Sequence, residues 1–132
     1  MKTPSIFFAV LLLFSVSQGC KSTSADPDLA TTLVGTYKGK QIPTGDTPYA
    51  SSVAIAKTSA KIIELTITDL TDNSVDAQID NIAVSSATTF SGLYDPYGNG
   101  KGFDIDGTVS GNTLTMRVKY SGQVVLTFTG NK

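Results

Sequence analysis

The residues best suited to contact a ligand lie in one segment, residues 94–102, where Tyr94 and Tyr97 stand among glycines. Tyrosine offers a large contact area at a low entropic cost, and loops carry many binding residues. The segment therefore suits contact with a ligand or a partner. The alternative is a glycine-rich hairpin loop whose tyrosines cap the end of the folded core, because nothing in the segment specifies a ligand.

Catalytic chemistry has few candidates, because the 132 residues contain no histidine and one cysteine. These counts exclude a Ser-His-Asp or Cys-His pair, an imidazole metal site and a CxxC zinc site. The carboxylates belong to aspartates and to Glu64, and nearly all fall in turns or at outward strand positions. A catalytic pair needs a concave, partly buried setting that raises one pKa. We therefore expect no enzyme and no cofactor.

Calcium is the metal that the acidic residues near the tyrosines could hold. A calcium site needs several oxygen ligands that converge, whereas the strand pairing predicted below matches Asp104 and Asp106 with basic residues. We therefore expect no metal site. The residues with oxygen atoms suitable for calcium are Asp95, Asn99, Asp104 and Asp106.

The formal net charge of −1, with 16% charged residues, provides no basic surface for nucleic acid.

The first twenty residues have the pattern of an export signal. Lys2 precedes an apolar run over residues 6–16, which is too short to span a membrane and has the length of a signal-peptide core. The run ends in residues 17–20, Ser-Gln-Gly-Cys, which resemble the lipobox of bacterial lipoproteins, although Ser17 stands where that family usually has Leu. The resemblance implies cleavage before Cys20 and lipid attachment to its sulfur. The alternative is an ordinary cleaved signal followed by an incidental cysteine.

This interpretation divides the chain into three parts. Residues 1–19 form the lipoprotein signal peptide, and residues 20–32 comprise the lipidated Cys20 and a flexible tether without apolar periodicity. Residues 33–132 form the folded domain. We expect the mature protein in the bacterial cell envelope, anchored through its N-terminal lipid to the outer membrane, with the domain periplasmic or exposed at the surface.

The domain consists of short segments rich in Thr, Val and Ile, separated by Gly, Asn, Asp and Pro, with no helical stripe. Such spacing is typical of antiparallel strands. We predict an all-β fold, an eight-stranded antiparallel up-and-down β-barrel, because closure leaves no exposed edge on a sheet with one apolar face. A β-sandwich is the alternative. The predicted strands are 33–40, 50–58, 62–70, 75–85, 88–94, 103–110, 113–120 and 124–130.

Alternation along residues 103–120 predicts one hairpin together with its register. A two-residue turn at 111–112 places charges of opposite sign across from one another on the outer face. The expected pairs are Asp106 with Arg117 and Asp104 with Lys119. Exposed pairs of this kind are evidence for the register, whereas their contribution to stability is small.

Two other connections are constrained by the need to keep apolar residues on one face. A two-residue turn at 121–122 would place Met116 opposite Thr127 and turn the apolar face outward. We therefore predict a three-residue connection at 121–123, with Gly122 at positive φ. The same argument predicts a three-residue connection at 59–61.

Short motifs near both ends of the domain resemble the calycin-like or lipocalin-like β-barrel domains of small bacterial lipoproteins. Residues 35–39, Gly-Thr-Tyr-Lys-Gly, resemble the opening strand of calycin barrels, and residues 107–116 and 126–130 resemble their closing hairpins. Tyr37 stands where lipocalins have Trp, and no Arg follows the last strand to stack on it. The resemblance implies a barrel over residues 33–132, and it implies no substrate and no catalytic residue.

The barrel interior and its mouth form the remaining candidate site. Eight strands enclose an interior that side chains can just fill, or that holds one small apolar ligand. The residues expected to bind a ligand are Tyr37, Phe90, Tyr94, Tyr97 and Phe103. The side chains expected to point inward are Tyr37, Val53, Ile55, Ile63, Leu65, Ile67, Phe103, Ile105, Leu114, Met116, Val118, Leu126 and Phe128.

Two functions stay open at this stage. The first is binding of a small apolar ligand inside the barrel, which requires a cavity that the ligand can enter. The second is a protein-interaction module or enzyme inhibitor that uses the mouth loops, which requires a filled barrel with Tyr94 and Tyr97 exposed. Residues 90–94, Phe-Ser-Gly-Leu-Tyr, resemble the Ser-Gly-x-x-Tyr segment of barrel-shaped lysozyme inhibitors, which are also lipoproteins.

Overall fold

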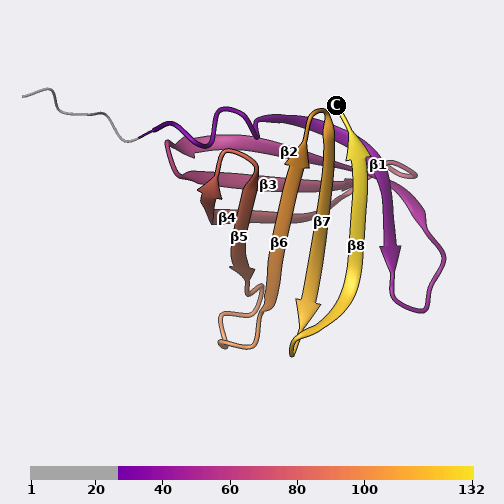
Figure 1. The fold of residues 1–132 in the computed structure, drawn as a ribbon. Helices are drawn as coiled ribbons and strands as arrows, with labels where there is room; N and C mark the ends of the chain where they lie inside the picture. The colour runs from indigo at the N-terminus through magenta and orange to yellow at the C-terminus, as the bar shows by residue number, and fades with distance from the viewer. Residues whose placement is uncertain (1–26) are drawn as a thin grey trace, which may run out of the picture.

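The computed structural model describes residues 27–132, which form a closed antiparallel β-barrel (Figure 1). Each strand pairs with the next one along the chain, and the last strand pairs with the first to close the sheet. The predicted eight-stranded up-and-down barrel is therefore confirmed, and the alternative β-sandwich is wrong. The strands are β1 (Gly35–Pro43), β2 (Tyr49–Ser59), β3 (Ile62–Asp69), β4 (Val75–Ser86), β5 (Thr89–Tyr94), β6 (Phe103–Ser110), β7 (Thr113–Tyr120) and β8 (Gln123–Asn131).

The N-terminal predictions concern a different part of the chain. The predicted signal peptide, residues 1–19, and the predicted lipid-attachment residue Cys20 lie outside the described residues. Within residues 27–132, no helix is long and apolar enough to cross a membrane.

The hairpin of β6 and β7 has the register that its charge pattern predicts. Asp106 lies opposite Arg117, and Asp104 lies opposite Lys119. Arg117 Nε donates to Asp106 Oδ2 at 3.1 Å, and Lys119 Nζ lies 2.5 Å from Asp106 Oδ1, so Lys119 forms its ion pair diagonally. Burial raises the pKa of Asp106, but the hydrogen bond from Lys119 and the two positive charges outweigh it and leave that pKa below its ordinary value.

The two connections predicted to contain three residues contain two instead, at 60–61 and 121–122. In the β7–β8 turn, Ser121 and Gly122 have φ angles of 51° and 79°, which suit a tight hairpin of the primed type, and the positive φ predicted for Gly122 is confirmed. The register then shifts along β8, where Val125 is the extra residue of a β-bulge. Met116 consequently lies opposite Phe128 as predicted, and the apolar face stays inward.

One end of the barrel is closed by large apolar side chains. Ten of the thirteen side chains predicted to point inward are buried, whereas Phe103, Val118 and Leu126 are half-buried. Phe90 fills the space beside Gly107, where a Cβ atom would lie 2.0 Å from Phe90 Cζ. The buried predicted residues are Tyr37, Val53, Ile55, Ile63, Leu65, Ile67, Ile105, Leu114, Met116 and Phe128.

Residues 28–34 cover this closed end before β1 begins. Ala30 and Leu33 are fully buried, and the Ala30 amide donates to the carbonyl oxygen of Ala60, in the β2–β3 turn, at 3.0 Å. The tether predicted for residues 20–32 is therefore packed against the barrel from residue 28 onward, because its apolar side chains complete the core.

Candidate functional site

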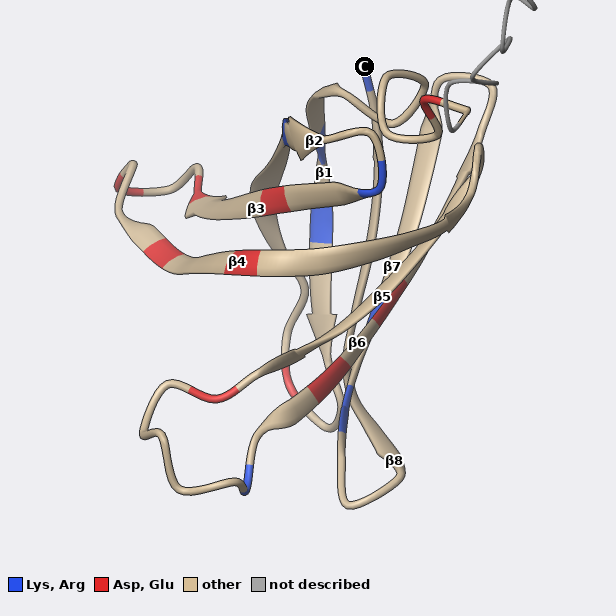
Figure 2. Cartoon of the chain, turned by 90° about the vertical axis from the view of Figure 1, so that its left-hand side faces the viewer, with Lys and Arg blue, Asp and Glu red and all other residues tan. Residues whose placement is uncertain are grey.

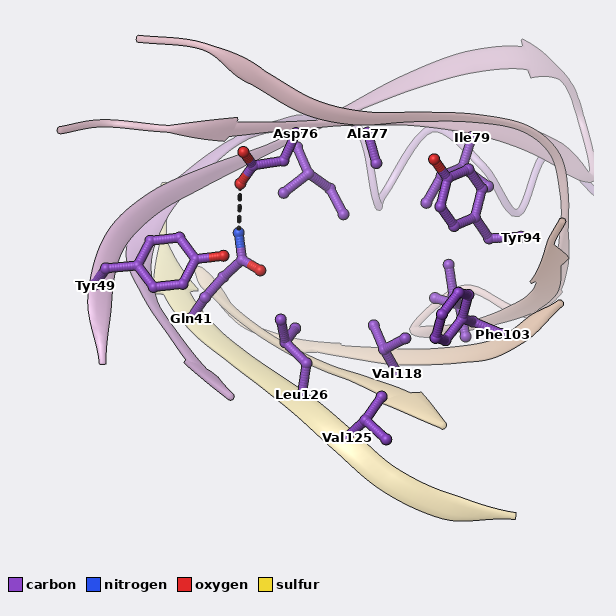
Figure 3. A pocket seen from close by; sticks show the side chains of 12 residues that line it. Gln41, Tyr49, Asp76, Ala77, Ile79, Tyr94, Phe103, Val118, Val125 and Leu126 are labelled. Carbon is purple, nitrogen blue, oxygen red and sulfur yellow. Dashed lines mark hydrogen bonds between the residues drawn. The ribbon is translucent and has the colours of Figure 1, made fainter. Parts of the chain in front are cut away.

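The opposite end of the barrel is open and holds a cavity of about 300 Å³ (Figure 3). Its walls come from the last residues of odd-numbered strands and the first residues of even-numbered strands, which meet at one end of an up-and-down barrel. The volume is at the lower limit of ligand pockets in proteins, which is about 300 Å³. The side chains that line the cavity are Gln41, Tyr49, Ile67, Asp76, Ala77, Ile79, Tyr94, Phe103, Ile105, Val118, Val125 and Leu126.

Aromatic rings form one side of the cavity mouth. Tyr94 and Phe103 stack with their ring centroids 6.4 Å apart and an angle of 29° between the ring planes. The ring of Tyr120 extends this group, with its centroid 5.4 Å from that of Phe103. Aromatic contacts of this kind contribute about 0.5–1.5 kcal/mol beyond their burial, so they help to hold this side of the mouth in shape.

A polar cluster lies across the cavity from the aromatic pair (Figure 3). Gln41 is only 3% exposed, and its Nε2 donates to Ser51 Oγ at 2.8 Å and to Asp76 Oδ2 at 3.3 Å. Ser51 Oγ donates in turn to the carbonyl oxygen of Thr68 at 2.9 Å. Because the hydroxyl proton of Ser51 is used there, Ser51 can only accept from Gln41, and this fixes the orientation of the Gln41 amide.

The fixed orientation turns the carbonyl oxygen of Gln41, Oε1, toward the cavity (Figure 3). Within residues 27–132, the hydrogen bonds of the Gln41 side chain are made by its nitrogen, and no group donates to Oε1. Oε1 can accept up to two hydrogen bonds. The polar cluster therefore presents an open acceptor to whatever occupies the cavity.

A β-bulge in β4 brings Asp76 into the polar cluster. The register between β3 and β4 shifts between Ile67 and Thr68, which leaves Asp76 as an extra residue without a partner on β3. A bulge of this kind re-aims a side chain, and here the Asp76 carboxylate reaches Gln41. Among the residues that the structure describes, no Lys or Arg forms an ion pair with this carboxylate.

Tyr49 completes the polar cluster, and its hydroxyl points toward Gln41 (Figure 3). Burial raises the pKa of the Tyr49 phenol, and the negative charges of Asp76 and Asp69 raise this pKa further. The phenol is therefore protonated at neutral pH and can donate one hydrogen bond.

The five residues predicted to bind a ligand occupy three different places. Tyr94 and Phe103 line the cavity. Tyr37 and Phe90 lie in the closed end, where they are 0% and 2% exposed. Tyr97 is 79% exposed in the loop between β5 and β6 and does not line the cavity. The structure thus brings two of the five together at the open end.

Tyr37 closes the barrel at the end opposite the cavity. Its hydroxyl donates to the carbonyl oxygen of Leu33 at 2.9 Å, and Lys132 Nζ lies 5.2 Å from the centroid of its ring. Lys132 Nζ also donates to the carbonyl oxygen of Val34 at 3.1 Å. Lys132, which follows the last strand, therefore places its ammonium group over the Tyr37 ring, and such contacts contribute about 0.5–1 kcal/mol at exposed sites.

The polar cluster is not among the sites predicted from the sequence. The predicted first strand ended at residue 40, although Gln41 continues the inward alternation that begins with Tyr37. Extending the inward alternation of the first strand by one residue places Gln41 inside the barrel. Asp76 carries no such signal, because alternation with the inward Ala77 places it outside, and the bulge that changes this leaves no mark in the sequence.

The acidic residues near the tyrosines have a role in the backbone of the β5–β6 loop. The Asp95 carboxylate accepts hydrogen bonds from the amides of Gly100 at 2.7 Å and Tyr97 at 3.2 Å. The hydrogen bond from Gly100, with smaller contributions from other loop amides, lowers the pKa of Asp95. Within residues 27–132, no group of His, Cys, Asp or Glu has the arrangement of a metal site.

The fold and the cavity together define a class of protein, a closed eight-stranded antiparallel barrel with one sealed end and one open end. The chain matches no protein-family model and no curated protein. Among solved structures it is similar to a Bacteroides fragilis protein provisionally described as an outer membrane protein, with a TM-score of 0.58 and 20% sequence identity. The likeness covers 82% of this chain and 54% of that one, so this chain spans about half the length of its neighbour. At this identity the likeness concerns the fold alone.

Proposed function

We propose that this protein is a lipid-anchored barrel of the bacterial cell envelope that binds a small, largely apolar ligand in its open end. The observation that carries this proposal is the cavity of about 300 Å³ with mostly apolar walls. A small barrel can be filled completely by its own side chains, and a filled interior would leave no room for a ligand. The closed end of this barrel is filled in that way, and the open end is not.

The envelope location and the family relation belong to the same proposal. The Bacteroides fragilis neighbour, provisionally described as an outer membrane protein, supports an envelope location. The closed barrel and the position of Lys132 over Tyr37 support a relation to the calycin-like domains of small lipoproteins. The lipid anchor at Cys20 rests on the lipobox-like residues 17–20.

We favour ligand binding over a protein-interaction or inhibitor function. The interaction function requires a filled barrel and two exposed tyrosines at the mouth. Tyr97 meets this requirement, whereas Tyr94 is half-buried against the core and borders the cavity. The favoured function therefore uses the inside of the open end.

Blocking the cavity tests this function. The full-length protein is reconstituted in phosphatidylcholine nanodiscs, and binding of the neutral probe 2-naphthalenemethanol is measured by titration calorimetry against empty nanodiscs. We expect saturable binding to the wild type and its loss in Val118→Trp, because Val118 lines the cavity and an indole ring fills the space.

Ile42→Trp is the matched control, because Ile42 is 46% exposed on a neighbouring part of the barrel and does not line the cavity. This variant is expected to bind the probe as the wild type does. Equal binding by Val118→Trp would contradict the proposed function, as would the absence of saturable binding to the wild type of any naphthyl probe of this size.

A further inference from the structure

The cavity has two chemically different sides. Tyr94 and Phe103 present aromatic faces and edges on one side, and Gln41, Asp76 and Tyr49 present polar atoms on the other (Figure 3). Aliphatic side chains form the wall between them. A ligand that satisfies both sides has an apolar body and a polar group at one end.

The polar side mainly offers acceptors. Gln41 Oε1 receives no donor from residues 27–132, and both protons of the Gln41 amide nitrogen are directed at Ser51 and Asp76. An ionised carboxylate only accepts hydrogen bonds, so Asp76 adds further acceptor sites. The Tyr49 hydroxyl is the one group of the cluster that can donate into the cavity. The polar group of the ligand must therefore be a donor, and it must supply more than one hydrogen.

The charge around the cavity selects a cation among the possible donors. Asp76 forms no ion pair within the described residues, and the loops of the open end carry Asp46, Asp72 and Asp95 against Lys101. Figure 2 shows acidic residues along β3, β4 and the loop between them. Charges of one sign around a cleft raise the local concentration of ligands of the opposite sign.

Lys101 is outnumbered by the three aspartates of these loops, and the basic residues on the β6–β7 hairpin do not offset the remaining negative charge. Arg117 and Lys119 are both bound to Asp106 on the outer surface of the β6–β7 hairpin. None of the residues that line the cavity is a Lys or an Arg. A carboxylate ligand would therefore meet an acidic mouth and a cluster of acceptors without a cation.

We propose that the cavity binds a small amphipathic amine, with its ammonium group donating to Gln41 Oε1 and the Asp76 carboxylate and its apolar body lying against Tyr94 and Phe103. The cavity has the volume of about ten molecules of liquid water, which suits a body the size of one or two fused rings. This ligand class rests on the proposed function and specifies it further.

Three probes of one shape test the charge of the ligand. The full-length protein in phosphatidylcholine nanodiscs is titrated with 2-naphthylmethylamine, 2-naphthalenemethanol and 2-naphthoate. We expect the amine to bind roughly tenfold more tightly than the alcohol, since hydrogen bonds to charged groups are stronger than neutral ones, and the acid to bind most weakly. The preference for the amine shrinks as salt concentration increases.

A matched pair of variants tests the residue. Asp76→Asn removes the charge beside Gln41, and Asp80→Asn removes an equal charge from a position on the same strand that does not line the cavity. We expect Asp76→Asn to bind the amine and the alcohol with nearly equal affinity, and Asp80→Asn to keep the wild-type preference. Circular dichroism melting curves establish that both variants fold.

The outcomes separate this inference from the proposed function. Failure of all three probes to bind the wild type would contradict both. Binding of the alcohol as tightly as the amine, or tighter binding of the acid, would overturn the amine and leave a cavity that binds apolar ligands. A preference for the amine that persists in folded Asp76→Asn would overturn the role given to Asp76.

Discussion

Gly107 shows how a missing side chain shapes the closed end of the barrel. A Cβ atom at this position would lie 2.0 Å from Phe90 Cζ, and Phe90 is only 2% exposed. The Phe90 ring therefore occupies the space that a side chain at position 107 would fill. Because protein interiors are packed like crystals, the ring has no free volume into which it could move. Gly107 and Phe90 thus form one packing unit that seals the end opposite the cavity.

Gly107→Ala is expected to destabilise the protein by about 1–3 kcal/mol through overpacking. The free energy of unfolding is measured by urea denaturation of the full-length protein. In Phe90→Leu the smaller side chain leaves room for the new methyl group, so the double variant should be destabilised by less than the sum of the two single variants. Additive effects would show that the glycine and the ring do not share the same space.

At the scale of strands and turns, hydrophobic alternation predicts the barrel and its registers, and the β-bulges escape prediction. The alternating pattern of residues 103–120 fixes the β6–β7 hairpin, because slipping by one residue would expose the apolar face. The β7–β8 connection has one residue fewer than this argument requires, and a bulge at Val125 restores the register. Hydrophobic alternation indicates that one extra residue is present near the turn, but it does not show whether that residue lies in the turn or in a β-bulge.

The same limit explains the incomplete prediction of the site. Tyr94 and Phe103 could be predicted, because they stand at the ends of strands beside a glycine-rich loop. Gln41 follows from alternation once β1 is extended by one residue. Asp76 enters the cavity through a bulge that depends on the pairing of β3 with β4. This pairing cannot be predicted from a single sequence.

The β5–β6 loop is expected to lose order in acid. Its Asp95 carboxylate holds the Gly100 amide, and this hydrogen bond lowers the pKa of Asp95. The bond is therefore complete above the ordinary pKa of an aspartate and is lost as the pH falls through the lowered value. In a titration followed by NMR, the Gly100 amide shift should move with a midpoint below the ordinary aspartate range.

Asp95→Asn is the control for this titration, because an amide does not ionise. Its Gly100 amide should show no such transition. A wild-type midpoint at or above the ordinary aspartate range would argue against the hydrogen bond. Because Asp95 lies at the surface, the melting temperature of the barrel should change little between the two proteins.

At the scale of the whole molecule, both ends of the described chain lie at the sealed end. Residues 28–34 cover this end, and Lys132 reaches over Tyr37 to the carbonyl oxygen of Val34. From the anchor proposed at Cys20, the chain up to residue 28 can extend by at most about 30 Å. The proposed anchor would therefore hold the sealed end near the membrane and leave the cavity mouth at the far side.

Cys20→Ser tests this arrangement at its attachment point. The full-length protein is expressed in its host with radiolabelled palmitate, and we expect label in the wild type and none in Cys20→Ser. Ser22→Ala, two residues further on, is the control and should keep the label. Label that persists in Cys20→Ser, or its absence from the wild type, would contradict lipidation at this residue.

In the proposed anchored protein, the position of both ends of the described chain at the sealed end would separate attachment from recognition. Changes in the length of the proposed tether would alter how the barrel is held and leave the shape of its mouth intact. Substitutions in the loops and strand ends of the mouth alter what enters and leave the closure of the barrel intact. In barrels with this arrangement, the mode of membrane attachment and the choice of ligand could therefore change independently in evolution.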